Sequence, residues 1–346
     1  MLEQYYGDHL NRQEETNAYD ELRSAIQHRM DSCFLCGVTI EQAGKVLKAI
    51  TNDCPQFFEC MLVYQRKRQE RNGVLISLSY KDVDRYRMER AKRKALDTIE
   101  KRIGRYGSDY LVAKCVYDYL AETVSGDDEP LEEYSRICSL ENDEQRTQEM
   151  LAYLQEYGNQ FTAYGALAEK KAVCMGVAMA YKLLMDELKI GTACVSGKVG
   201  EVNHMMNVVE IDGKCGFCDV TRGKKIENLP MIRYDYFLVS EKRICDYFSP
   251  DTAFSCETDE LSYFHRNHLD FKSINSLRKY LNSFTYQATG GMLRCKFSNM
   301  GDVRKEVEEL VHQIVIKRAG REYMITGYAL HNGVLNCLIE RRESTL

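Results

Sequence analysis

The sequence predicts an α+β fold in which a buried helix packs against an antiparallel sheet. Three stretches favour this class. Apolar residues recur at helical spacing from Cys174 to Leu188. Asp212-Gly213 then separates two β-rich runs, which is a strong signal for a hairpin with a two-residue turn. Residues 234–240 have the composition of a returning strand, so the helix and the sheet are expected side by side.

Composition excludes several classes of function. The 346 residues are 44% hydrophobic, which is enough for two or three domains with packed cores. The net charge is −5 and 29% of residues are charged with both signs, so we expect no nucleic-acid partner and no membrane partner. The first residues are polar and acidic, and no apolar run approaches the ~20 residues of a membrane span, so no signal peptide or transmembrane segment is expected.

The cysteines indicate a reducing compartment. There are 14 of them, scattered without framework spacing through a chain too long to need disulfides for stability. A cytoplasmic location is therefore the expectation, with secretion by a route that the sequence does not reveal left open.

Residues 1–106 are expected to form a mainly helical N-terminal region. Thr39 should cap one of its helices. The last helix is rich in basic residues but has an apolar side, so we interpret its charges as a solvated face rather than a nucleic-acid surface. The expected elements are helices at 11–29, 39–49 and 81–105, and a hairpin of 60–64 with 74–80.

Two Cys-x-x-Cys pairs raise the question of a metal. Cys33 and Cys36 lie in a predicted connection, and Cys215 and Cys218 lie in the hairpin. Residues three apart on a strand point to opposite faces, so the second pair is poorly placed to bind one zinc ion. A redox Cys-x-x-Cys belongs at a helix start, not on a strand. We expect no metal and no cofactor.

The predicted helix carries a candidate nucleophile in its first turn. Unpaired N–H groups and the positive end of the helix dipole favour an anion there, so a thiolate at Cys174 would gain stabilisation. Gly176 is small enough to let this end of the helix approach a sheet closely, and Gly191 is the expected stop.

The hairpin brings a histidine and an aspartate together. If Asp212-Gly213 forms the whole loop, Ile211 pairs with Lys214 and Met206 faces Asp219. His204 and Asp219 then lie on one face as diagonal neighbours, about 7–8 Å apart at the backbone, which an imidazole and a carboxylate can span.

Cys174, His204 and Asp219 are therefore a candidate catalytic triad: a thiol, a general base and an acid that orients the imidazole. Two alternatives stay open. A buried cysteine is usually a small core residue, and a single histidine on a strand is more often structural than catalytic.

These strings also resemble a known family. AVCMGVAMAYKLL, HMMNVVEIDGKCGFCDVT and YDYFLVS are similar to the transglutaminase-like superfamily, particularly to bacterial members related to papain-type peptidases. The resemblance implies a papain-like core with Cys174 as nucleophile, His204 as base and Asp219 as acid. The chain departs from the family where His-Ala-Trp-Asn is replaced by His204-Met-Met-Asn, and it contains no tryptophan.

In similar enzymes a donor upstream of the nucleophile completes the oxyanion hole with the nucleophile's own N–H. Tyr164 is the first choice here and Gln160 the second, with a tyrosine that only packs as an equal alternative. Met206 shares the predicted face with His204, so it is expected to touch the substrate.

The resemblance also divides the chain. It implies a transglutaminase-like catalytic domain at 107–260, with an acidic insertion at about 125–158 that is either a lid or a solvated excursion. A C-terminal α+β region, 261–346, follows. Its expected elements are helices at 273–282 and 302–318 and strands at 293–297, 323–329 and 334–339.

The function expected is a cysteine hydrolase, a peptidase or amidase, that acts on amide bonds of a protein or peptide through an acyl-enzyme. Two alternatives remain: a protein-glutamine transglutaminase or deamidase with the same triad, and a non-catalytic protein-binding module on this fold. The oligomeric state is not predicted.

Overall fold

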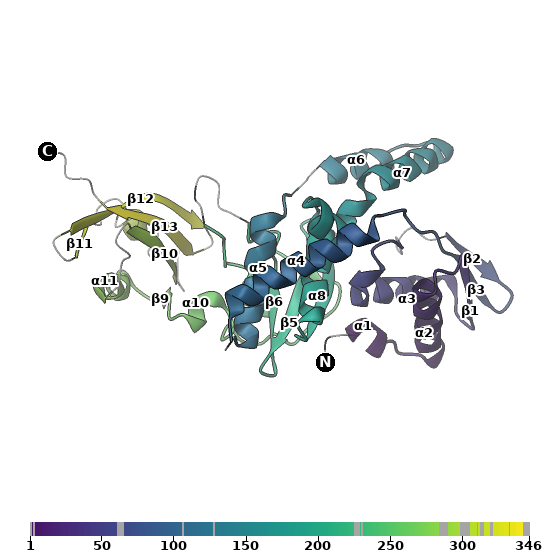
Figure 1. Ribbon diagram of the computed structural model, residues 1–346, viewed down its shortest axis with the longest axis horizontal. Coiled ribbons are helices and arrows are strands. Elements are labelled where there is room, and N and C mark those ends of the chain that lie inside the picture. Colours follow the sequence, from purple (N-terminus) through teal and green to yellow (C-terminus); the bar gives the residue numbers. More distant parts are fainter. Residues whose placement is uncertain are drawn as a thin grey trace.

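The protein is described by a computed structural model, in which an elongated chain places its N-terminal and C-terminal elements at opposite ends of a central unit (Figure 1). Within the described residues, no helix combines the length and apolar character needed to cross a membrane. The structure describes residues 2, 4–60, 66–105, 107–126, 129–224, 229, 231–283, 290–297, 305–309, 311, 315–318, 321–331 and 333–341.

The N-terminal elements are helices and a small sheet with the order β1-β3-β2. Thr39 caps α3 as predicted, in a reciprocal capping box with Gln42. The elements are α1 (Tyr5–Asp8), α2 (Gln13–Gln27), β1 (Ser32–Cys36), α3 (Ile40–Asp53), the short 3₁₀ helix η1 (Pro55–Phe57), β2 (Arg66–Glu70) and β3 (Gly73–Ser77).

The predicted hairpin of this region is wrong in its partner. β3 pairs with β1 and with β2. The strand β2 comes later in the chain than residues 60–64, which were expected to pair with β3. Cys60 keeps only an isolated bridge to Tyr80, and residues 61–64 lie outside the described residues. Cys33 and Cys36 lie on β1 rather than in a connection, one buried and the other exposed.

Two long helices lead into the central unit: α4 (Arg85–Ile103) and α5 (Asp109–Thr123). The Ser108 side chain accepts the Leu111 N–H and so caps the start of α5. Met88, Ala95 and Ile99 bury the apolar side of α4 in the central core, so the interpretation of its charged side as a solvated face is consistent with the packing.

The acidic stretch forms a helical hairpin of α6 (Glu129–Cys138) and α7 (Asp143–Tyr157). It projects from the central unit (Figure 1). A 3₁₀ turn, η3 (Gly158–Phe161), and a π-helical turn, η4 (Gly165–Glu169), connect it to the next helix.

The central unit confirms the predicted α+β arrangement. Helix α8 (Cys174–Glu187) packs against strands β4 and β5 of an antiparallel sheet with the order β7-β6-β5-β4-β8. The helix ends before Gly191, because Lys189 already has a positive φ of 63°. The strands are β4 (Thr192–Val199), β5 (Val202–Ile211), β6 (Lys214–Cys218), β7 (Phe237–Val239) and β8 (Ser249–Pro250).

The register of the β5–β6 hairpin is the predicted one. Ile211 pairs with Lys214 and Asn207 with Cys218. Asp212 and Gly213 have φ values of 53° and 73°, as a two-residue turn with two left-handed residues requires.

Both faces of this sheet are covered. Met205, Val209 and Cys218 face the core under α8, whereas Met206 and Phe217 face a second core on the other side. A segment from α9 (Glu241–Ile244) through β8 and on to Phe254 crosses that second side, and its Phe248 and Phe254 join the same core.

The C-terminal elements form a separate sheet with the order β11-β12-β13-β10-β9 and a core of their own. The predicted helix at 302–318 is wrong at its end, because residues 315–318 form strand β11. The elements are α10 (Tyr263–Arg266), β9 (Asp270–Phe271), α11 (Ile274–Ser283), β10 (Gly290–Phe297), β11 (Val315–Arg318), β12 (Arg321–His331) and β13 (Val334–Arg341).

Candidate active site

Cys174 is the first residue of α8, and the turn before it is fixed from outside the helix. The N–H of Val173 donates to the carbonyl of Gln160 at 3.1 Å. A Cβ at Gly176 would lie 2.3 Å from that same oxygen and 2.9 Å from the carbonyl oxygen of Thr162. Gly176 therefore permits close packing, as expected, but against the 160–162 segment rather than the sheet.

His204 and Asp219 are joined as the register predicts. His204 Nε2 lies 2.8 Å from Asp219 Oδ2, and the two side chains are 11% and 1% exposed. The carboxylate accepts two further hydrogen bonds, from the Arg222 N–H to Oδ1 at 3.1 Å and from the Tyr247 hydroxyl to Oδ2 at 3.2 Å. Because the carboxylate accepts from its partners, Nε2 is the donor in the pair, and Nδ1 is left for the thiol.

The environment of His204 favours its charged form. Burial acts to lower the pKa of the imidazole, but the charge of Asp219 and its hydrogen bond, followed by the hydrogen bond and charge of Cys174, outweigh burial and raise that pKa to about 10. At neutral pH the ring is therefore an imidazolium in hydrogen-bonding contact with the Cys174 thiol. A thiol beside an imidazole that a carboxylate orients is the arrangement used by cysteine nucleophiles.

Cys174 and His204 open into one cavity of about 460 Å³, which we call the Cys174 cavity. That volume lies within the range of about 300–1,000 Å³ typical of ligand sites. The cavity is lined by Leu131, Tyr134, Phe161, Val173, Cys174, Met175, Ser196, Gly197, Asn203, His204, Met205 and Asp251.

Met206, which was expected to touch the substrate, does not line the Cys174 cavity. Met206 is 1% exposed and packs in the second core with Phe217, and Met205 lines the cavity in its place. Met206 shares a strand face with His204, but Phe248 covers that face next to the imidazole. The ring centroids of Phe248 and His204 are 6.0 Å apart.

The two oxyanion candidates lie in different surroundings. Tyr164 is 4% exposed, its ring stacks on Phe58 with centroids 5.9 Å apart, and it does not line the Cys174 cavity. It is placed as a packing residue. Gln160 lies beside the first turn of α8, and its buried Oε1 has no hydrogen-bond partner among the described residues. Gln160 does not line the Cys174 cavity either, so its role as an oxyanion donor stays a prediction.

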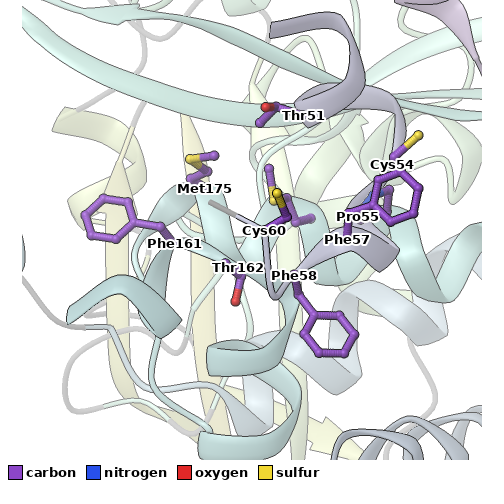
Figure 2. A pocket seen from close by; sticks show the side chains of 10 residues that line it. Thr51, Cys54, Pro55, Phe57, Phe58, Cys60, Phe161, Thr162 and Met175 are labelled. Carbon is purple, nitrogen blue, oxygen red and sulfur yellow. The ribbon is translucent and has the colours of Figure 1, made fainter. Parts of the chain in front are cut away.

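A second pocket lies between η1 and the start of α8 (Figure 2). Phe161 and Met175 line both this pocket and the Cys174 cavity, and Pro55 and Phe57 line its far side (Figure 2). Its volume of about 30 Å³ is enough for one or two waters but not for a substrate side chain.

Sequence reasoning missed three residues around the triad. Tyr247 donates to Asp219, Phe248 packs on His204, and the Arg222 guanidinium lies 4.6 Å from the centre of the Tyr247 ring. Arg222 lies in a turn after β6, and Tyr247 and Phe248 lie between α9 and β8. No periodic pattern marks a functional side chain in such segments. In the described part of the chain, no group of three His, Cys, Asp or Glu side chains is arranged to hold a metal ion.

The raised pKa of His204 predicts a pH-dependent contribution to stability. A pKa raised above the ordinary value stabilises the folded state fully below about pH 6.5, and the contribution is lost as the pH rises through about 10. The contribution is on the order of a few kcal/mol. Urea unfolding of wild type and His204→Gln at pH 6, 8 and 10 measures it, since other titrating groups cancel in the difference. A difference that stays constant over this range would contradict the prediction.

Comparison with solved structures gives three distant neighbours. The chain is similar to a crystal structure of a TGase, with 14% identity over 56% of this chain and 51% of that one and a TM-score of 0.31. It is also similar to "a Putative Cysteine Protease from Cytophaga hutchinsonii", with 12% identity over 46% of this chain and 61% of that one and a TM-score of 0.25. A third neighbour is "a putative protease from Parabacteroides distasonis", with 10% identity over 81% and 56% and a TM-score of 0.24.

These neighbours are a transglutaminase and two protease-like proteins. The chain spans about half to three fifths of the length of each. No protein-family model and no curated protein matches it.

Proposed function

We propose that the protein is a cysteine hydrolase that cleaves amide bonds of a protein or peptide. The observation that carries the proposal is the His204–Asp219 pair, 2.8 Å apart and almost fully buried, with the Cys174 thiol in contact with the imidazole. A structural histidine needs no nucleophile beside it and no cavity in front of it, whereas a thiol–imidazole–carboxylate set at a cavity is what acyl transfer requires.

The proposed reaction has two halves. Cys174 Sγ attacks the amide carbonyl carbon, and the N–H at the start of α8 stabilises the oxyanion. His204 then gives its proton to the leaving amine, which departs and leaves a thioester on Cys174. In the second half His204 takes a proton from water, the hydroxide attacks the thioester, and the thiolate leaves as a carboxylic acid product forms. Asp219 holds the ring orientation throughout.

Hydrolysis is favoured over amine transfer by the surroundings of the thiol. Cys174 is partly exposed, and the side chain that lines the cavity next to His204 is the flexible Met205. Strand β5 contains no phenylalanine, tyrosine or tryptophan, so it supplies no rigid ring beside His204 that would keep water from an acyl-enzyme.

The fate of the acyl-enzyme tests the proposal. The purified chain is incubated with a mixed protein substrate, with and without a labelled primary amine at millimolar concentration, and the products are read by mass spectrometry. We expect new peptide termini, or glutamate from glutamine, with little amine incorporation. Cys174→Ala is the control and should yield neither product.

Other outcomes separate the alternatives. Dominant attachment of the amine to glutamine, lost in Cys174→Ala, would overturn hydrolysis in favour of a transglutaminase with the same triad. No product from any substrate, together with partner binding that survives Cys174→Ala, would favour a binding module.

A further inference from the structure

One wall of the Cys174 cavity comes from the α6–α7 hairpin. Leu131 and Tyr134, one turn apart on α6, line the cavity opposite residues of β4 and β5. Tyr134 is an exposed large hydrophobic side chain on a helix that also carries Glu132, Glu133 and Arg136. With Phe161, they give this side of the cavity an apolar character.

The acidic residue of the cavity has a charged partner. Asp251 lies on the other wall, and its carboxylate is 2.7 Å from the Nζ atom of Lys48, which comes from α3. Lys48 thus partly neutralises the negative charge of Asp251, which could otherwise attract a basic side chain of a substrate. The cavity therefore favours an apolar side chain over a basic one.

The α6–α7 hairpin is also connected to the nucleophile. α6 packs on α7, α7 packs on η3, and η3 packs on α8. The carbonyl of Gln160, in η3, accepts the Val173 N–H immediately before Cys174. A side chain that fills the space beside Leu131 and Tyr134 therefore contacts the elements that hold the thiol in place.

We infer that Leu131 and Tyr134 form a specificity subsite for a bulky apolar side chain of the polypeptide substrate, next to the amide that Cys174 attacks. The inference rests on the proposed hydrolase function and adds the substrate class. It assigns the acidic excursion a role in recognition, because the excursion supplies the apolar wall of the cavity while Glu129, Glu132 and Arg136 of α6 are exposed.

The test compares cleavage preferences in a peptide library randomised around the cleaved bond. Wild type should cleave next to Leu, Phe or Met at least about 10-fold faster than next to Gly, Asp or Lys, the discrimination expected of an apolar pocket. Leu131→Ala and Tyr134→Ala should each lower kcat/KM for the apolar peptides about 10-fold and leave the Gly peptides nearly unchanged. Leu151→Ala is the matched control, since Leu151 is an exposed leucine on α7 that does not line the cavity.

A second readout separates recognition from damage to the site. Alkylation of Cys174 by iodoacetamide, a reagent too small to need the subsite, should proceed at the wild-type rate in all three variants. If Leu131→Ala and Tyr134→Ala keep the wild-type preference, or if wild type prefers charged side chains, the proposed subsite is wrong. The hydrolase proposal is unaffected by either result. If wild type cleaves no peptide, the hydrolase proposal and the subsite proposal are both wrong.

Discussion

Replacing Asp219 with asparagine should leave the fold intact and lower the turnover number about 10⁴-fold. The hydrogen bonds of the site explain why. Arg222 N–H requires an acceptor at the Oδ1 position, so the amide oxygen of an asparagine would face it and the amide nitrogen would face His204 Nε2. The imidazole would then accept at Nε2 and carry its proton on Nδ1, toward Cys174. In that tautomer it cannot take the proton of the thiol.

Tyr247→Phe is the matched control for this variant. It removes one hydrogen bond to the same Asp219 oxygen and keeps the carboxylate, so its effect on turnover should be far smaller. Circular dichroism and thermal unfolding establish that both variants fold, and turnover is measured with any peptide whose cleavage depends on Cys174. Turnover of Asp219→Asn within 10-fold of wild type would remove Asp219 from the mechanism.

Cys174 should be alkylated roughly 100-fold faster than the other cysteines at about pH 6, where an ordinary thiol is almost fully protonated. The charged imidazole of His204 beside the sulfur and the N–H groups at the start of α8 are the physical causes. Several of the other thiols are buried, and burial raises the pKa of Cys33 and Cys54 to about 11 and that of Cys194 to about 12. Mass spectrometry after a short pulse of iodoacetamide identifies the labelled site.

The His204→Ala variant supplies the control, because it removes the imidazolium and keeps the helix start. Its label should spread to other accessible cysteines, such as Cys36 and Cys245, which are exposed. Label that is evenly spread in wild type, or centred on Cys215, would show that the thiol of Cys174 is not activated. The experiment needs no knowledge of the substrate.

The sequence predicted the His204–Asp219 pair because the pair depends on local rules. A two-residue Asp-Gly turn sets the register of its hairpin, and strand alternation then places both side chains on one face. Cys174 followed from the periodicity of its helix. The same rules failed for Met206, since alternation assigns a face and says nothing of which loop covers that face.

Tyr247 and Phe248 were beyond prediction for the same reason. They reach the site through a crossing segment whose only strand, β8, pairs with β4 for two residues. The strand β11 was missed because Val315 and Ile316 fit either a helix or a strand by periodicity, and pairing with β12 decided for the strand. Contacts between residues far apart in the sequence determined the place of Tyr247 and Phe248 and the formation of β11. Local preference determined neither.

The crossing segment also sets the order in which the site can be completed during folding. A chain that has formed β5 and β6 already has His204 near Asp219, but Tyr247 and Phe248 arrive only when the much later β8 pairs with β4. Closing that long loop has an entropic cost and makes this pairing slow relative to the hairpin. The covering of His204 by Phe248 is therefore expected to be the last step in the assembly of the site.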